Sequence, residues 1–229
     1  MMLAQASISV NKLAEYMESK AARQRKILAD RKYPDPEFKL GAYHREAEDA
    51  VAKYLCGGAI DPTCLTNQRN SLSQVNTEKV GTARRINSNI DAIDRFSEML
   101  DDIDLLGADV VPGHQNAPPL TYWNVMISVR PEIILRGQGP KGKTFIGAIK
   151  LHFSKTHPLT EDAAGYVSAV VQEYCKKSLC NDEELVHAPY CQVIDVGCSK
   201  VFKGVKSTSQ RMKDIAAECQ NIAGLWPSI

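Results

Sequence analysis

The stretch YWNVMISVRPEIILRGQGPKGKTFIGAIKLHF, residues 122–153, decides the fold that we expect. Apolar side chains recur at every second position from 123 to 129, which is the period of a β-strand. A proline at position 131 ends that strand, and residues 132–135 predict a second, short strand. Residues 144–153 are apolar almost throughout, as is typical of a central strand. The stretch therefore predicts three consecutive strands.

The residues before this stretch favour helices. Apolar residues at helical spacing predict helices over residues 10–32, 42–55 and 82–106. The first of them has Ser9 or Asn11 as its candidate N-cap. The segment between the second and third helices, residues 57–80, is rich in Gly, Pro, Asn, Ser and Thr and is interpreted as a loop.

The residues after the stretch predict a further helix and strand. An amphipathic helix is expected from Thr160 to about Lys177, with carboxylates at its start and lysines at its end, as the helix dipole prefers. A strand or hairpin is expected over residues 190–202, and a final helix over 207–223. The chain is therefore predicted to be an α/β protein.

Length and composition indicate an ordinary globular protein. The chain has 229 residues, of which 44% are hydrophobic and 24% charged. No apolar run approaches the roughly 18–20 residues that a membrane span needs, and the N-terminus lacks the features of a signal peptide. We expect a soluble, cytoplasmic protein. The sequence pattern changes at Gly107 from helical to strand-like. Residues 1–106 are therefore expected to form a helical part that packs on an α/β core of residues 107–229, and the two parts together to form one compact domain.

The net charge of +1 does not indicate a nucleic-acid binder, but two stretches of the chain are basic. They cover residues 20–32 and 200–213. Either is a solvated surface or a place that meets phosphate, and both interpretations stay open. The candidate nucleic-acid contacts are Arg23, Arg25, Lys26, Lys203 and Lys206.

A phosphate-binding loop is one alternative. Residues 137–144, GQGPKGKT, fit the pattern GxxxxGK[ST]. That loop needs a helix directly after it, whereas FIGAIKLHF is β-like. Pro140 also removes one backbone N–H donor. A glycine-rich turn between two strands explains the match better. A strand with Asp195 that could resemble a magnesium-binding strand does not change this, because too little chain remains for a nucleotide-binding sheet.

A zinc site is another alternative. Cys175, Cys180, His187 and Cys191 lie near one another in the sequence, but their spacings lack the paired CxxC knuckles of structural zinc sites. The chain has seven cysteines, and in a protein that is not secreted we expect free thiols in or near the core.

The most informative pair is Glu132 and Lys150. A lysine inside a central strand needs a partner, because burial of its ammonium group is costly. Glu132 is that partner if the two strands form a hairpin. A structural salt bridge would satisfy this geometry. A metal-dependent phosphodiesterase would instead use the carboxylate to bind Mg²⁺ and the lysine to stabilise the nucleophile or the transition state.

The order helix, three strands, helix, strand, with Pro-Glu on the second strand and a lysine on the third, resembles the PD-(D/E)XK nuclease superfamily and its RecB-like and lambda-exonuclease-like branch. The resemblance covers roughly residues 41–56 and 120–203. It implies a restriction-endonuclease-like core (α-β-β-β-α-β) with an N-terminal helical extension, and Mg²⁺ or Mn²⁺ as cofactor. Gly41-Ala-Tyr-His44 matches the branch's Gly-x-x-His. The resemblance further implies a Gln and a Tyr on the helix after the lysine strand, for which Gln172 and Tyr166 or Tyr174 are candidates.

One position departs from the superfamily pattern. The acid expected two residues before the lysine is replaced by Ala148. An acid that has moved, from Glu48, Glu161 or Glu173, is one interpretation, and weak metal binding is another. The third is a catalytically inactive fold that binds protein or nucleic acid. His152 shares the strand face of Lys150 and either supports the site or is packed.

These observations lead to two hypotheses. The first is a nuclease-like protein that acts on or binds DNA, with Glu132, Lys150 and Gln172 as catalytic residues and with His44, Glu132 and Glu48 as metal ligands. The second is an inactive member of the same fold that serves as a binding module, with a protein partner through the N-terminal helix as one option. By analogy, such small proteins are components of mobile elements or defence systems. A nucleotide hydrolase is the third reading.

Overall fold

The computed structural model describes residues 3–34, 43–114, 116–139 and 142–229. The fold is α/β, as the sequence predicts, and its centre is a mixed sheet with the strand order β2-β5-β6-β8-β9. Strands β2, β5 and β6 are antiparallel neighbours, β8 runs parallel to β6, and β7 pairs with another part of β6. The strands are β2 (Asp109–Pro112), β5 (Ile133–Gln138), β6 (Thr144–His152), β7 (Glu184–Val186), β8 (Val193–Asp195) and β9 (Lys200–Phe202).

A second, smaller sheet has the order β1-β4-β3. Its strands are β1 (Ser7–Ser9), β3 (Leu120–Tyr122) and β4 (Val125–Ser128). The prediction of one strand from 122 to 130 was wrong. The chain reverses at Trp123 and Asn124, whose φ angles of 49° and 59° suit a two-residue hairpin turn. The alternating pattern continues across this turn and hides it.

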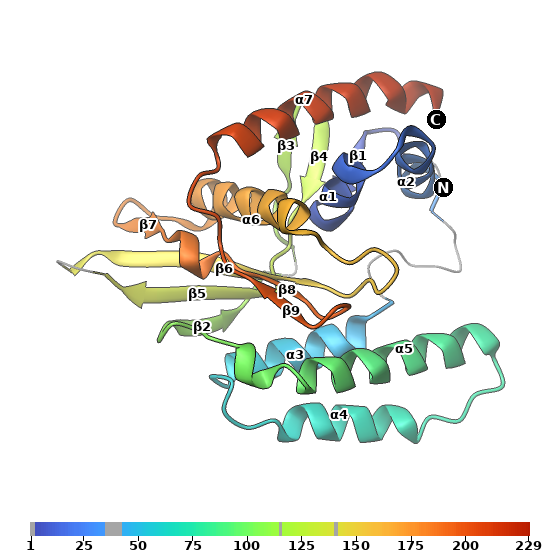
Figure 1. The fold of residues 1–229 in the computed structure, drawn as a ribbon, viewed down its shortest axis with the longest axis vertical. Coiled ribbons are helices and arrows are strands. Elements are labelled where there is room, and N and C mark those ends of the chain that lie inside the picture. The colour runs from blue at the N-terminus through green and yellow to red at the C-terminus, as the bar shows by residue number, and fades with distance from the viewer. Residues whose placement is uncertain (1–2, 35–42, 115, 140–141) are drawn as a thin grey trace.

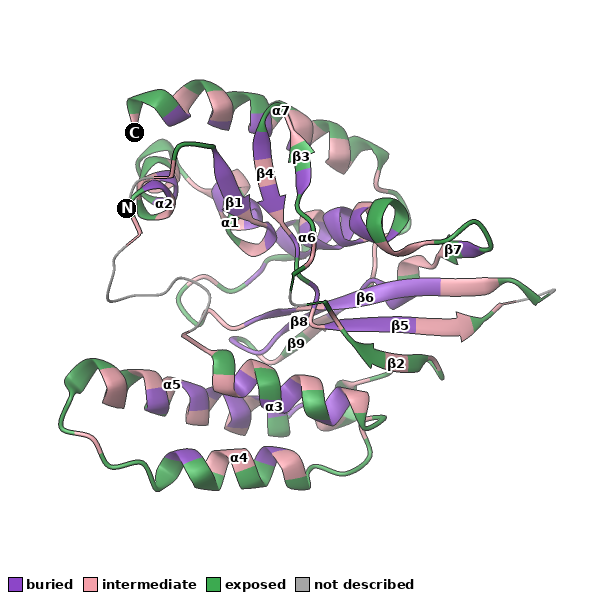
Figure 2. Cartoon of the chain, turned by 180° about the vertical axis from the view of Figure 1, so that it is seen from behind, coloured by how far each residue is buried: buried purple, intermediate pink, exposed green. Residues whose placement is uncertain are grey.

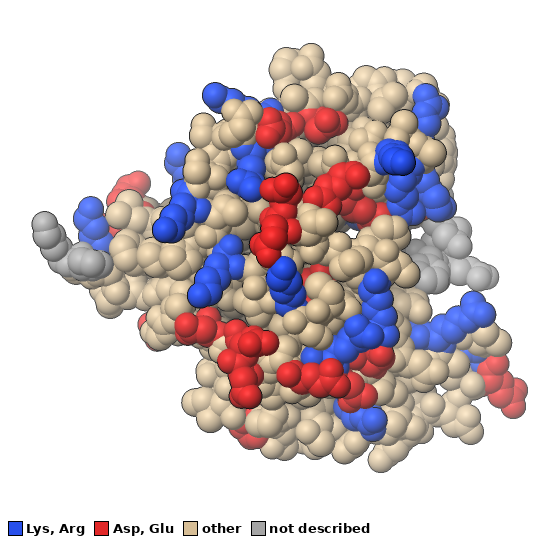
Figure 3. All heavy atoms as spheres, in the orientation of Figure 1, with Lys and Arg blue, Asp and Glu red and all other residues tan. Residues whose placement is uncertain are grey.

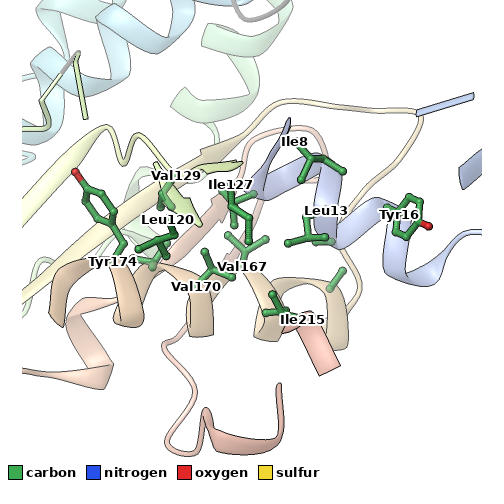
Figure 4. Packing of buried hydrophobic residues seen from close by; sticks show 14 of the residues in the cluster. Ile8, Leu13, Tyr16, Leu120, Ile127, Val129, Val167, Val170, Tyr174 and Ile215 are labelled. Atoms are coloured by element: carbon green, nitrogen blue, oxygen red, sulfur yellow. The ribbon is translucent and has the colours of Figure 1, made fainter. Parts of the chain in front are cut away.

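Four helices lie on one side of the central sheet, around the small sheet (Figure 1). They are α1 (Val10–Glu18), α2 (Ala21–Lys32), α6 (Glu161–Tyr174) and α7 (Ser209–Leu225). Ile127 and Val129 meet Leu13, Val167 and Ile215 in the core on this side (Figure 4). The core continues to Ala148 on β6, so the position of the absent acid is filled by tightly packed apolar groups.

The predicted helix over residues 10–32 is two helices. Ser19 has an extended backbone, with φ −89° and ψ 150°, and separates α1 from α2. The prediction of Ser9 as an N-cap is confirmed, because its side chain accepts a hydrogen bond from the Lys12 N–H. Burial of Leu13 and Tyr16 on α1 and of Leu28 on α2 shows that both helices face the core.

Three helices lie on the opposite side of the sheet (Figure 1). They are α3 (Arg45–Cys56), α4 (Thr63–Ser73) and α5 (Val80–Ser97). Helices α3 and α5 are next to the sheet, and α4 packs outside them. Figure 2 shows their buried residues on the sides that face one another and the sheet. The prediction of a loop over 57–80 was wrong, because Leu65 and Leu72 anchor α4 against its neighbours although the helix is otherwise polar. Helix α5 ends at Ser97 and does not continue to residue 106.

The remaining predictions concern the last third of the chain. The helix expected from residue 160 is α6, with Thr160 as its N-cap, and it runs on as a π-helical turn over Cys175–Leu179. The expected hairpin is formed by β8 and β9, and the final helix is α7. Among the described residues, no helix combines the length and the apolar character needed to cross a membrane.

Candidate functional site

A cleft of about 550 Å³ opens where the starts of α1 and α3 and the middle of α5 meet the ends of β4 and β6. Four residues singled out from the sequence line it, although they come from distant segments: His44, Glu48, Glu132 and Lys150. His152, at the end of β6, lines it as well. The fold therefore brings the upstream helix and the strand pair into one site.

The Glu132–Lys150 pair lies in the floor of this cleft. The two side chains form an ion pair and are only 7% and 11% exposed. The second carboxylate oxygen of Glu132 accepts the Leu151 backbone N–H at 2.7 Å, and Lys150 Nζ also donates to the Arg130 carbonyl at 3.0 Å. The hairpin that the sequence predicts, β5 with β6, places the pair side by side. The partner expected for the buried lysine is thus present.

A close backbone approach fixes Glu132 from the other side. Gly113, directly after β2, donates its N–H to the Glu132 carbonyl at 2.8 Å. A Cβ at position 113 would lie 1.8 Å from the Pro131 carbonyl oxygen, so only glycine fits there. Sequence analysis did not identify this role, although the Pro-Gly pair after two valines was a visible signal for it.

Glu48 is the acid that the fold adds to the pair. Burial and, after it, the negative charge of Glu132 raise the pKa of Glu48 to about 7, although Lys150 and Arg130 act in the opposite direction. The carboxylate therefore lines the same cleft as the pair and lies within electrostatic range of both of its members. Of the three acids proposed to replace the one missing at Ala148, Glu48 alone is in the cleft.

The other two candidate acids are engaged elsewhere. Glu161, at the start of α6, pairs with Lys200, and Glu173, near the end of α6, pairs with Lys177 and accepts from Tyr122. Neither residue lines the cleft. The sequence could not separate the three acids, because their distances from Glu132 depend on contacts between segments that are far apart in the chain.

His44 stands at the wall of the cleft. Its ring stacks on Phe153 with centroids 5.2 Å apart, and its Nε2 is 2.8 Å from the Ser88 hydroxyl. Burial lowers the pKa of His44, and the neighbouring His152 lowers it further. The neutral ring is the form that binds metals. Among the described residues, however, no group of three or more His, Cys, Asp or Glu side chains is arranged to hold a metal ion, so the predicted ligands do not form a ready-made cage.

Gln172 and the two tyrosines do not line the cleft. The Gln172 amide donates to the Ser168 hydroxyl and to the Val205 carbonyl, which ties α6 to the segment before α7. The Tyr166 hydroxyl donates to Asp214, and Tyr174 is buried in the core. The catalytic role expected for Gln172 therefore has no support from its position.

Asp195 and His152 each bind the segment that follows β6. The Asp195 carboxylate is fully buried and accepts the Leu159 N–H at 2.7 Å and the Cys198 N–H at 3.3 Å. His152 donates from Nε2 to the His157 carbonyl at 2.8 Å. Both residues therefore hold the segment that connects β6 to α6.

The two rejected motifs can be located as well. In the GQGPKGKT stretch, residues 140 and 141 lie outside the described residues, but Thr144 opens strand β6 and no helix follows. Of the cysteine set, Cys175 hydrogen-bonds to Cys191, and this bond with burial raises the pKa of the Cys175 thiol. His187 instead stacks on Phe145 with ring centroids 4.5 Å apart. Because β5 and β6 pair as an antiparallel hairpin, the GQGPKGKT match lies between two strands and not before a helix.

Most of the basic residues in the two stretches are already paired. Arg23 binds Glu15, Lys26 pairs with Asp30, and Lys32 is buried against the Trp226 carbonyl. Arg25, Lys203 and Lys206 are exposed. Acidic and basic side chains alternate across the face shown in Figure 3. The stretches therefore do not form one continuous basic track on that face.

Asn89 positions the start of α3, and with it His44 and Glu48. Its buried amide accepts the Ala47 N–H at 2.9 Å and donates to the Tyr43 and Arg85 carbonyls at 2.7 and 2.9 Å. Asn89→Ala should lower the free energy of unfolding by about 2–4 kcal/mol, because buried backbone groups lose their partners. Urea titration measures the change. Asn87→Ala, on the exposed side of the same helix, is the matched control and should change it by under about 0.5 kcal/mol. Equal losses of stability in the two variants would contradict the role of Asn89 in positioning the start of α3.

The raised pKa of Glu48 predicts a pH-dependent stability. Between the ordinary value of 4.5 and about 7, the folded state binds more protons than the unfolded state, so stability falls as the pH rises through this range. Glu48→Gln should therefore be more stable than the wild type at pH 8 by roughly 1–3 kcal/mol, with the difference disappearing as the pH falls below about 4.5. Urea titrations at both ends of this pH range measure it.

The control for this prediction is Glu98→Gln, which removes an exposed carboxylate at the end of α5. It should leave the pH dependence of the wild type unchanged. A Glu48→Gln protein that is no more stable than the wild type at pH 8 would show that the ionised Glu48 side chain does not destabilise the folded state.

A scan against protein-family models finds no match for this chain, and a search of curated proteins finds no significant match. The function must therefore be argued from the cleft itself.

Proposed function

We propose that this chain binds DNA in the cleft and hydrolyses phosphodiester bonds with the help of Mg²⁺ or Mn²⁺. The observation that carries the proposal is that Glu48, an acid from another element, lines the same cleft as the Glu132–Lys150 pair. Two carboxylates and a lysine in one cleft are the groups that such hydrolysis needs. The missing acid at Ala148 then has a replacement.

The sheet supports the same proposal. When the intervening α4, α5, β3, β4 and β7 are set aside, the elements α3, β2, β5, β6, α6 and β8 run in the α-β-β-β-α-β order that the resemblance implies, with β6 and β8 parallel. Its first strand is β2, and residues 122–130, which we expected in that place, belong to the small sheet. Strands β3 and β4 of the small sheet are therefore an insertion between the first and second strands of the proposed core, and β1 joins them from the N-terminal part of the chain.

Glu48 and Glu132 are the residues that would hold the cation. Mg²⁺ in proteins is often bound through only one or two carboxylates, together with water and substrate phosphates, so a cage of three side chains is not required. Burial and, after it, repulsion from Glu132 raise the pKa of Glu48, and the positive charge of a divalent cation would offset both effects. When bound, such an ion polarises the phosphate and activates a water molecule.

Lys150 has a separate task in this proposal. Its ammonium group can donate three hydrogen bonds, and two go to Glu132 and to the Arg130 carbonyl. The third donor is free to reach a phosphate oxygen or the attacking water, since no further partner is found among the described residues. Glu132 and the Arg130 carbonyl thus orient Lys150 towards the substrate.

The test is cleavage of end-labelled single- and double-stranded DNA by purified protein with Mg²⁺, with Mn²⁺ and with EDTA. Cleavage that requires the cation and is lost in Glu132→Gln would support the proposal. A protein that retards DNA without cleaving it would be an inactive binding module. That second candidate is favoured by the packing of Ala148 in the core, which leaves no space for an acid. No binding and no cleavage would overturn both.

A further inference from the structure

Arg130 has an unusual backbone. Its φ is 41°, in the left-handed region that residues with a side chain seldom adopt, and it precedes Pro131. A following proline favours an extended backbone. The conformation is therefore unfavourable for this residue type, and such outliers cluster where function requires a particular geometry.

The left-handed conformation has a local consequence. It turns the Arg130 carbonyl towards Lys150, whose Nζ donates to it at 3.0 Å. The chain then continues through Pro131 to Glu132, the second partner of the same lysine. The main chain at Arg130 thus takes part in positioning Lys150, and this contact does not depend on which side chain residue 130 carries.

The side chain of Arg130 has no such structural task. It is exposed at the cleft, and within the described parts of the chain its guanidinium forms no ion pair or hydrogen bond. Its positive charge acts to lower the pKa of Glu48, against the burial that raises it. The other cations of the cleft are already paired: Lys12 with Glu15, Arg95 with Asp91, Lys150 with Glu132 and Lys155 with Asp91.

We propose that Arg130 is a phosphate-binding residue of this cleft, which receives a backbone phosphate of the bound nucleic acid beside Glu48 and Lys150. This inference rests on the proposed function and assigns the substrate contact that it lacks. Arginine suits the task because its planar guanidinium binds a phosphate through two parallel hydrogen bonds. It also keeps its charge at every pH at which the carboxylates titrate.

The test uses Arg130→Gly, which removes the guanidinium and accepts a positive φ. Affinity for a fluorescein-labelled oligonucleotide, measured by anisotropy with Ca²⁺ present, should fall about 5- to 20-fold. The slope of log affinity against log salt concentration should decrease by about one, because one phosphate contact is lost. The melting temperature should equal that of the wild type or exceed it by a few degrees, since backbone strain is relieved.

Two further variants complete the experiment. Arg130→Lys keeps the charge, so its salt slope should stay close to that of the wild type while affinity falls only a few-fold. Lys53→Gln removes an exposed charge on α3 outside the cleft and should change neither quantity. Wild-type binding with unchanged affinity and slope in Arg130→Gly would overturn the role of Arg130 and leave the proposed function standing. A wild-type protein that binds no DNA would overturn both.

Discussion

Lys150→Ala is expected to lower the free energy of unfolding by about 3–5 kcal/mol, because it leaves the buried Glu132 carboxylate without its counter-charge. Both side chains of the pair are at least 89% buried, so water cannot replace the lost partner. Urea denaturation of the wild type and the variant measures the change. This is the largest effect on stability that we expect from one substitution in the cleft.

A double variant separates the loss of the pair from the loss of packing. Glu132→Gln with Lys150→Met keeps the side-chain volumes and leaves an amide oxygen that can accept the Leu151 N–H. It should regain most of the stability, because a buried ion pair is often replaceable by neutral groups of similar size. It should show no cleavage of DNA. A double variant as unstable as the single one would show that the lysine has another structural role.

The matched control is the exposed pair of Lys26 and Asp30 on α2. Their side chains are 63% and 54% exposed, and solvent screens the attraction between them. Lys26→Ala should therefore change the free energy of unfolding by less than about 1 kcal/mol. An equally large loss there would mean that burial of the Glu132–Lys150 pair is not the cause of the effect.

Glu48→Gln is expected to reduce metal-dependent DNA cleavage by roughly 10²- to 10⁴-fold, with the fold intact. The amide keeps the shape of the side chain but provides no negative charge for a divalent cation. Steady-state cleavage across a range of Mn²⁺ concentrations measures the effect. Since the variant should be more stable than the wild type at pH 8, a loss of activity could not be attributed to unfolding.

Asp49→Asn is the control for this second prediction, because Asp49 is the next residue on α3 and its side chain is 69% exposed. It should retain cleavage within a few-fold of the wild type. Full activity in Glu48→Gln would contradict the view that Glu48 replaces the acid missing at Ala148. Activity lost in both variants would indicate that the total charge of this part of α3 matters more than the position of one carboxylate.

Short-range patterns were enough to predict several parts of the fold. The short strand at 132–135, the glycine-rich turn and the apolar run at 144–153 predicted the β5–β6 hairpin, and the cost of burying Lys150 predicted Glu132 as its partner. Ser9 was predicted as a cap because its hydrogen bond is made within the next turn. These features depend on residues that lie close in sequence or directly across one hairpin.

Other parts of the fold could not be predicted from the local sequence pattern. The turn at Trp123 and Asn124 lies inside an alternating segment, and neither residue is the glycine that usually marks such a turn. Helix α4 is polar except for the few residues that face its neighbours, so its composition resembles that of a loop. Strand β1 has only three residues and is stabilised by its pairing with β4.

The sequence by itself determined the α/β class, the hairpin and the buried Glu132–Lys150 pair, because each results from periodicity or from the cost of burying a charge. Only the tertiary structure decided that Glu48, and neither Glu161 nor Glu173, lines the same cleft as that pair, and that the Arg130 guanidinium has no partner among the residues that the structure describes. The physical reason is that these relations depend on how α3 and α5 pack against the sheet, and contacts between segments so far apart leave no periodic signal in the sequence.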